Sequence, residues 1–246
     1  MSRKEKLKQL YDKLIPPFCR LPLWLMLIWN VGGYELFKLF TFGREPYDMT
    51  LPIDEAIPVL APTVLIYFAS FVFWFFGYIV ASRIDKPSLC RFFAADVTAK
   101  LVTFILFVAF PSVRVRPEVV GEGFFPWLLR LLYVIDTPFG LFPSIHCLNS
   151  WLCFLGVRSQ KSVPLWYKIF ACVFALAIFA STLTTAQHVF VDVISGAALG
   201  EIFWFVSGHT PLSSLAGKTL EGADKVKERF FGLFKRKSKA AQANEE

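Results

Sequence analysis

The chain has 246 residues, of which 55% are hydrophobic, 17% aromatic and only 18% charged. Its mean hydropathy is +0.52, which excludes a water-soluble globular domain. The net charge of +7 arises from 26 basic residues against 19 acidic ones. This composition predicts an integral membrane protein with basic segments outside the bilayer.

Six apolar stretches follow one another along the chain, and a helix of about 20 apolar residues is enough to cross a bilayer. They cover residues 21–42, 57–81, 92–110, 141–157, 165–185 and 189–206, and the fourth is short. The predicted fold class is therefore all-α, a bundle of six transmembrane helices. Three segments are expected: a basic leader (1–20), a six-helix membrane domain (21–207) and a basic tail (208–246).

Most of the lysines and arginines lie in the leader, in the tail, and in the connections after the second and fourth apolar stretches. With six spans, all of these segments fall on one side of the membrane. Basic loops stay in the cytoplasm, so both termini are predicted to be cytoplasmic in a multi-pass protein of the plasma membrane. In the tail, Val226, Phe230, Leu233 and Phe234 recur at helical spacing. This spacing suits an interfacial helix, and a frayed solubilising tail is the alternative.

Charged residues also occur inside the predicted spans. Asp96 and Lys100 stand four residues apart in the third apolar stretch. Residues at this spacing share a helix face, and unpaired charges in a membrane are costly. We expect the two to neutralise each other, and a proton relay is the alternative.

The sequence offers no pattern for a metal or a nucleotide. Its five cysteines form no C-x-x-C pair, and neither a carboxylate cluster nor a glycine-rich phosphate loop is present. We therefore expect no metal, no cofactor and no nucleic-acid partner.

Two arginines stand in the connection after the third apolar stretch. Arg114 and Arg116 are separated by one residue, and Pro117 follows them. The residue before a proline prefers an extended conformation, in which side chains two residues apart point the same way. Two guanidiniums can then bind one phosphate, and contact with lipid headgroups is the alternative. Further along, three roles are open for Asp136: it orients one of these arginines, it selects among lipid headgroups, or it opens the turn at Pro138.

The segment Pro143-Ser144-Ile145-His146 opens the fourth apolar stretch. Proline suits the first helical turn, where its missing N–H is not needed. The free N–H groups of that turn and the Ser144 hydroxyl can attract a phosphate. His146 is then placed to protonate a leaving oxygen. A capped helix with a polar interfacial residue is the alternative.

A second histidine stands where the sixth apolar stretch begins. His188 and Asp192 are four residues apart and would share one face of a helix. The carboxylate can hold one ring nitrogen and leave the other free to attack as a nucleophile. A chance pairing at a helix end is the alternative, although ionisable residues near a span are seldom idle.

Taken together, these motifs resemble those of a known enzyme family. Pro143-Ser144-x-His146 and Ser181-Thr182-x5-His188-x3-Asp192 are similar to the second and third signature motifs of the type-2 phosphatidic-acid phosphatase and vanadium haloperoxidase superfamily, over roughly residues 111–200. Its membrane members have six helices. The resemblance implies that His188 forms a phosphohistidine, that Asp192 supports it and that His146 protonates the leaving group. Phosphate contacts are predicted for Arg114, Arg116, Ser144 and Thr182. Asp136 and Ser181 are predicted to support these residues without contacting the phosphate.

Two positions depart from the family pattern. The lysine expected seven residues before Arg116 is Ala109, and the arginine expected after Ser181 is Thr182. Losing a charge-assisted contact worth about 1.5 to 3 kcal/mol weakens the phosphate site unless Arg114 substitutes. A missing arginine is also a feature of inositol phosphorylceramide synthases. This chain resembles the pattern of those synthases at Phe142-Pro143-Ser144, Ser181-Thr182 and Gly196.

The resemblance predicts a lipid phosphatase that hydrolyses a lipid phosphate or diphosphate ester at the extracytoplasmic face of the membrane. One alternative is a phosphotransferase of the inositol phosphorylceramide synthase type. Another is a catalytically silent membrane scaffold. The expected partners are a lipid phosphate and the bilayer, while the identity of the lipid and the oligomeric state stay open.

Overall fold

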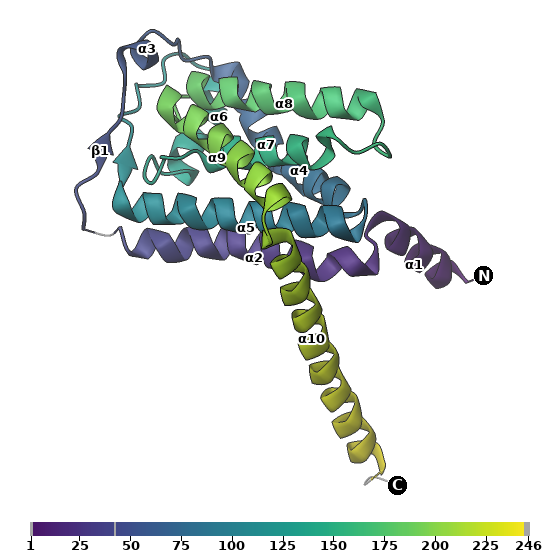
Figure 1. Cartoon of the computed structure of the whole chain (residues 1–246). Coiled ribbons are helices and arrows are strands. Elements are labelled where there is room, and N and C mark those ends of the chain that lie inside the picture. The colour runs from purple at the N-terminus through teal and green to yellow at the C-terminus, as the bar shows by residue number, and fades with distance from the viewer. Residues whose placement is uncertain (1, 42, 244–246) are drawn as a thin grey trace.

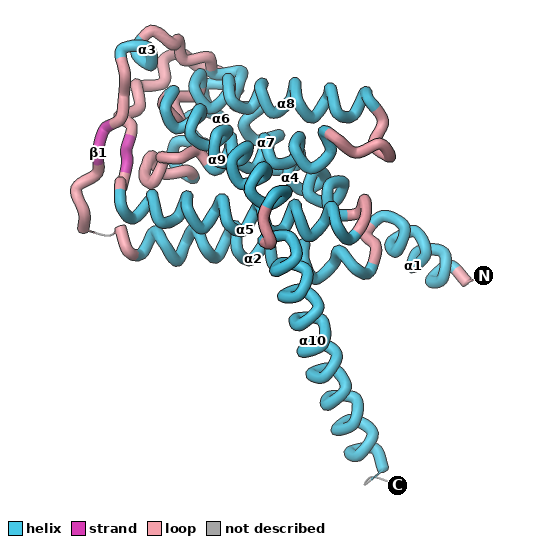
Figure 2. Tube along the Cα trace, viewed as in Figure 1, coloured by secondary structure: helices cyan, strands magenta, loops and turns pink. Residues whose placement is uncertain are grey.

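The computed structural model describes residues 2–41 and 43–243. This part of the chain is helical apart from its loops and two very short strands (Figure 2), so the all-α class is confirmed. In chain order the elements are α1 (Arg3–Leu14), α2 (Pro17–Leu39), β1 (Tyr47–Asp48), α3 (Pro52–Glu55), η1 (Ala61–Thr63), α4 (Val64–Ser82), α5 (Lys86–Ala109), β2 (Ser112–Val113), α6 (Phe124–Ile135), α7 (Ile145–Arg158), α8 (Leu165–Thr184), α9 (Phe190–His209) and α10 (Leu212–Ala243).

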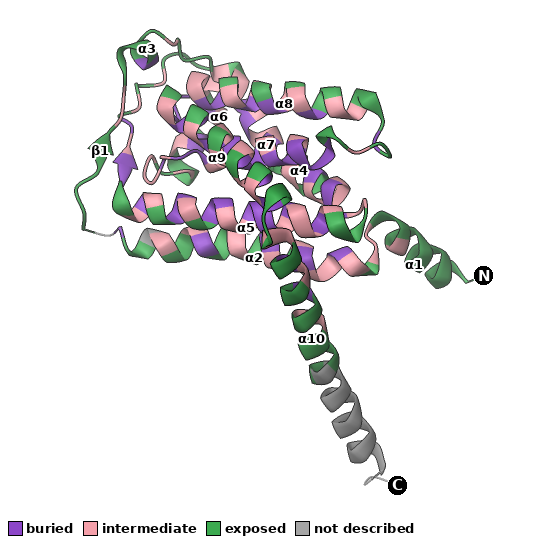
Figure 3. Ribbon diagram, in the orientation of Figure 1, coloured by how far each residue is buried: buried purple, intermediate pink, exposed green. Residues whose placement is uncertain are grey.

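Helix α7 lies in the middle of the bundle (Figure 1). It packs against α4, α5, α8 and α9, and Leu148, Leu152 and Leu155 along it are fully buried. Helix α2 packs along α5, while α10 starts against α5 and then projects away from the bundle. The outer faces of α2, α4 and α8 carry exposed residues (Figure 3). Many of these are large and apolar, such as Trp24, Phe75 and Trp166, which suits contact with lipid.

Four helices are long and apolar enough to cross a membrane: 61–82, α5, α8 and α9. Helices α1 and α2 pass the same test as a pair bent by 65°. The described residues therefore contain four or five candidate spans. The predicted span over 141–157 corresponds to α7, which has only 14 residues because the chain becomes helical after Ser144. Six spans and cytoplasmic termini stay predictions.

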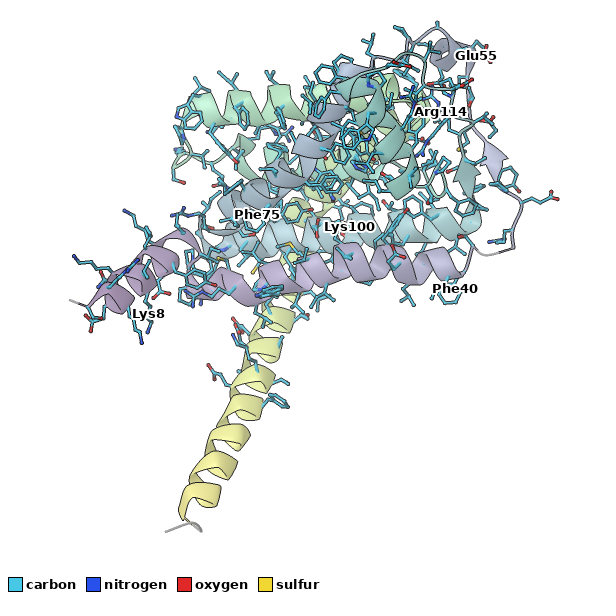
Figure 4. The ribbon with its side chains drawn as sticks, turned by 180° about the vertical axis from the view of Figure 1, so that it is seen from behind. Lys8, Phe40, Glu55, Phe75, Lys100 and Arg114 are labelled. Atoms are coloured by element: carbon cyan, nitrogen blue, oxygen red, sulfur yellow. The ribbon has the colours of Figure 1, made fainter. Side chains whose placement is uncertain are left out.

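The predicted pairing of Asp96 with Lys100 is confirmed. Lys100 Nζ lies 2.7 Å from Asp96 Oδ1, and neither side chain has exposed surface. The Tyr78 hydroxyl donates to the same carboxylate oxygen and accepts a hydrogen bond of 3.1 Å from Lys100 Nζ. Figure 4 shows Lys100 inside the bundle. The charge pair lies within α5, and its hydrogen bonds with the Tyr78 hydroxyl link α5 to α4.

The loops after α2 and α5 meet at one end of the bundle. Strands β1 and β2 pair in parallel there, with Tyr47 opposite Ser112. Figure 4 shows Glu55 and Arg114 at this end and Lys8 at the opposite end. The long loops and the basic leader are therefore separated by the length of the bundle.

Candidate active site

The two histidine motifs meet at the end of the bundle that carries the long loops. The ring centroids of His146 and His188 lie 5.7 Å apart. His146 belongs to the first turn of α7, and His188 to the turn between α8 and α9. The Ser144 N–H donates to the Asp192 carbonyl at 3.0 Å. This backbone bond ties the start of α7 to the start of α9 and holds the imidazoles together.

His188 contacts Asp192, as predicted. His188 lies before helix α9, however, whereas the prediction placed both residues on one face of that helix. Helix α9 begins at Phe190, after an extended Val189. The Asp192 carboxylate reaches back to this end: Oδ2 accepts from the Val189 N–H at 3.0 Å and lies 3.2 Å from His188 Nδ1. One carboxylate oxygen thus caps the helix and holds the imidazole. Because Nδ1 faces the carboxylate, Nε2 is the nitrogen left free.

His146 lies among aromatic side chains. The ring centroids of Tyr67, Trp74 and Phe71 lie 4.4, 5.0 and 5.8 Å from its own. Its Nε2 is buried and has no hydrogen-bond partner among the described residues. An unsatisfied buried nitrogen beside a second imidazole is available to a ligand.

Ser144 is the N-cap of α7. Its hydroxyl oxygen accepts from the Cys147 N–H at 3.3 Å, so Pro143 precedes the helix instead of occupying its first turn. The extended backbone at Ser144 ends the loop and turns the chain into α7. The side chain is fully buried, at the junction with α9.

Both predicted arginines reach the turn that contains His188. Arg114 donates to the His188 carbonyl. Arg116 donates to the side-chain oxygen of Gln187 and, at 3.1 Å, to the Tyr133 carbonyl. Two guanidiniums from the segment after β2 thus contact residues 187 and 188, and their binding of one phosphate stays a prediction.

Carboxylates accompany these arginines. Burial lowers the pKa of Arg114 and of Arg116, and the charges of Asp54 and Asp136, respectively, oppose that shift. Arginine keeps its proton under these conditions. The site therefore retains two positive charges beside His188, each balanced by a nearby acid.

A cavity of about 320 Å³ lies against both imidazoles, with Asp136 and Gln187 also on its wall. A second cavity of about 510 Å³ is lined mainly by residues of α2 and α4. The two share Asn30, Val31, Phe71 and Trp74 on their walls. The larger, mainly apolar cavity therefore lies next to the cavity beside the histidines.

Residues 128–205 match the sequence profile of the PAP2 superfamily. The chain contains a PAP2 superfamily domain. The resemblance inferred from the two histidine motifs is thereby confirmed. His146, His188 and Asp192 lie within the PAP2 domain, whereas Arg114 and Arg116 precede it. No curated protein and no solved structure matches the chain.

Two hydroxyl groups of the PAP2 domain are engaged within α8. Ser181 donates to the Ile178 carbonyl and Thr182 to the Phe179 carbonyl, each at 2.8 Å. Both side chains are buried, and the Thr182 oxygen lies 3.9 Å from Cys147 Sγ. The proton of Thr182 is therefore committed to its own helix, so this residue does not replace the donors of an arginine.

Asp54 supports the PAP2 domain from outside its sequence range. It belongs to α3 and is 1% exposed. Its carboxylate accepts from the Phe190 N–H at 2.6 Å and from the Leu51 N–H at 2.9 Å. Asp54 therefore attaches the loop after α2 to the first turn of α9. No sequence pattern pointed to it, because Asp54 lies 136 positions from Phe190.

Asp136 and Gln187 also have partners that the sequence did not predict. The Tyr67 hydroxyl donates to the Asp136 carboxylate, so α4 holds this acid at the cavity wall. Gln187 binds Arg116 through its side-chain oxygen. The only sequence signal for Gln187 is its position immediately before His188.

Proposed function

We propose that this protein is a membrane lipid phosphatase that hydrolyses a lipid phosphate or diphosphate ester through a phosphohistidine at His188. A PAP2 superfamily domain implies phosphatase-type activity on phosphate esters. The observation that carries the proposal is the contact of His188 Nδ1 with Asp192 at 3.2 Å, which leaves Nε2 free on a cavity shared with His146. A nucleophile held by an acid and paired with a second imidazole is the arrangement that covalent phosphoryl transfer requires.

The proposed reaction has two steps, formation of the phosphohistidine and its hydrolysis. His188 Nε2 attacks phosphorus and forms an N–P bond, while the P–O bond to the lipid breaks and its electron pair stays on oxygen. A protonated His146 gives its proton to that oxygen, so the alcohol leaves neutral. Water then attacks phosphorus and gives a proton to His146. The N–P bond breaks and inorganic phosphate is released. Asp192 keeps the His188 tautomer fixed throughout.

A lipid substrate is supported by the position of a mainly apolar cavity next to the cavity beside the histidines. The phosphate would lie in the cavity beside the histidines, and the hydrocarbon part would extend into the larger cavity, whose walls include Leu23, Leu27 and Phe75. Trp24 and Phe75 are also more than half exposed on the outer surface, so a chain could enter from the bilayer. Burial of apolar surface favours this placement.

We further propose that the site faces the extracytoplasmic side of the plasma membrane, with α7 as a sixth and short span and both termini in the cytoplasm. The basic leader lies at the end of the bundle opposite Arg114 (Figure 4), which agrees with the positive-inside rule. The tail is proposed to lie on the membrane surface. The side chains of Leu233 and Phe234, which belong to this proposal, lie outside the described residues.

The test is a turnover assay on the purified full-length protein in detergent micelles. Lipid monophosphates and diphosphates are supplied with and without a lipid alcohol as acceptor, and both inorganic phosphate and new phospholipids are quantified. His188→Ala is expected to abolish phosphate release. His209→Ala is the matched control, because His209 is exposed on the last turn of α9 and should keep full activity.

Three outcomes separate the candidate functions. Release of inorganic phosphate that needs His188 supports hydrolysis. A new phospholipid that appears only with the acceptor indicates a phosphotransferase. If wild type and His188→Ala form equal amounts of product, or if neither forms any, the proposed enzyme is refuted. The catalytically silent scaffold is then the remaining candidate.

A further inference from the structure

The side-chain amide of Gln187 has one end bound and one end free. Its oxygen accepts a hydrogen bond from Arg116 Nη2. A guanidinium carries donors only, so this contact fixes which end of the amide is oxygen and which is nitrogen. Gln187 is 1% exposed, and its Nε2 has no hydrogen-bond partner among the described residues. The described part of the chain therefore holds this buried NH₂ group in a defined orientation without supplying an acceptor for it.

This free donor belongs to a residue on the wall of the catalytic cavity. Gln187 lines the cavity of about 320 Å³ together with His146 and His188. Buried donors in proteins are nearly always satisfied by protein, water or ligand. Two imidazoles line this cavity, and Arg114 and Arg116 contact His188 and Gln187 beside it. The acceptor that complements these groups is an anionic oxygen.

The backbone holds Gln187 in a fixed position relative to the nucleophile. The N–H groups of Gln187 and His188 both donate to the Thr182 carbonyl, at 3.0 and 3.1 Å. Ala186, just before them, has a φ of 51° in the left-handed region, which non-glycine residues adopt rarely. A turn with these restraints presents adjacent side chains with little freedom, as a preorganised anion site requires.

We propose that Gln187 Nε2 donates to a non-bridging oxygen of the phosphoryl group under attack by His188. Gln187 would thereby supply the donor that is absent at Thr182, and Arg116 would orient it through the amide oxygen. This inference rests on the proposed function. It assigns to Gln187 a direct contact with the substrate, and to Arg116 a positioning contact in addition to its charge.

Gln187→Glu separates this role from a structural one. A glutamate keeps an acceptor for Arg116, so the turn and the fold should persist. It replaces the free NH₂ by an oxygen that repels phosphate. We expect kcat to fall about 100-fold or more, because a donor to a charged group in a preorganised site is lost, while the melting temperature stays near that of wild type. Gln187→Met, which lacks both polar ends, should lose activity as well as the Arg116 contact.

The matched control is Gln160→Glu. Gln160 binds Ser88 at 3.0 Å, in the loop between α7 and α8, away from the histidines. This variant introduces the same charge and should keep wild-type kcat. If Gln187→Glu keeps kcat within threefold of wild type, the proposed contact is wrong.

A second measurement distinguishes failure of this inference from failure of the proposed function. Orthovanadate, a phosphate analogue, is added to wild type and to Gln187→Glu, and the shift in melting temperature is recorded without any substrate. A shift in wild type that disappears in Gln187→Glu supports the contact even if no lipid phosphate is turned over. An equal shift in both proteins, or none in wild type, overturns it.

Discussion

Replacing Lys100 by methionine removes the charge that faces Asp96 inside the bundle. The two groups lie 2.7 Å apart with no exposed surface, so no solvent can take over the interaction. Asp96 Oδ2 already lacks a hydrogen-bond partner among the described residues. In Lys100→Met the buried carboxylate keeps only the hydroxyl of Tyr78 as a donor from the present cluster.

The expected loss of stability is large. Removing one partner of a fully buried ion pair destabilises a protein by about 3 to 5 kcal/mol, because the other charge is left uncompensated. For chains of about 150 to 250 residues, each kcal/mol lowers the melting temperature by roughly 2 to 4 °C. Lys100→Met should therefore melt roughly 6 to 20 °C below wild type. The double variant with Asp96→Asn removes both charges and should recover part of this loss.

Thermal unfolding in detergent can be followed with a thiol-reactive fluorophore, because Cys147 and Cys153 are free and buried in the folded protein. The matched control is Arg158→Met. Arg158 lies 2.7 Å from Glu201, but the two side chains are 42% and 43% exposed. Pairs exposed to this degree contribute about 0 to 1 kcal/mol, so this variant should melt within a few degrees of wild type.

Two results would refute the reasoning. One is a melting temperature of Lys100→Met that matches that of Arg158→Met, which would mean that the buried pair contributes no more than an exposed one. The other is a double variant that melts no higher than Lys100→Met. That result would show that the groups do not compensate each other.

Two further predictions concern the end of the bundle that carries the histidines. Gly196→Ala would place a Cβ 2.4 Å from the backbone oxygen of Ser144, and we expect this variant to lose most activity. The control is Gly32→Ala, because a Cβ at Gly32 meets nothing within 4 Å. Gly32→Ala should keep its activity and gain up to about 1 kcal/mol in stability. Asp54→Ala leaves the Phe190 N–H without its acceptor and should lower stability by about 1 to 3 kcal/mol. Asp54→Asn should lose less, because an amide oxygen still accepts one hydrogen bond. Unchanged melting curves for both Asp54 variants would contradict this role.

Much of the helical architecture follows from local composition. Five of the six apolar stretches correspond to α2, α4, α5, α8 and α9, because twenty consecutive apolar residues can satisfy their backbone in a membrane only as a helix. The fourth stretch, over 141–157, yields a helix of only 14 residues, which is too short for a straight span. Apolarity alone did not reveal that residues 141–144 belong to the loop.

Within the site, contacts between neighbours in sequence were predictable. His188 and Asp192 are close enough that any turn into a helix brings them together, even though the helix begins later than expected. Arg114 and Arg116 are separated by one residue and contact two adjacent residues, His188 and Gln187. The contacts of Gln187 with Arg116 and of Asp54 with Phe190 join residues 71 and 136 positions apart, and no local pattern records them.

The sequence by itself determined a membrane-embedded helical chain, two histidine motifs and the acid that accompanies one of them, because hydrophobic length and short spacings act locally. Only the tertiary structure decided that α7 and α9 begin side by side, through the bond between Ser144 and Asp192. It likewise decided that the Thr182 hydroxyl donates to a carbonyl within α8, while the side-chain NH₂ group of Gln187 has no acceptor among the described residues. These features depend on which helices pack together, and long-range packing is set by the whole bundle at once.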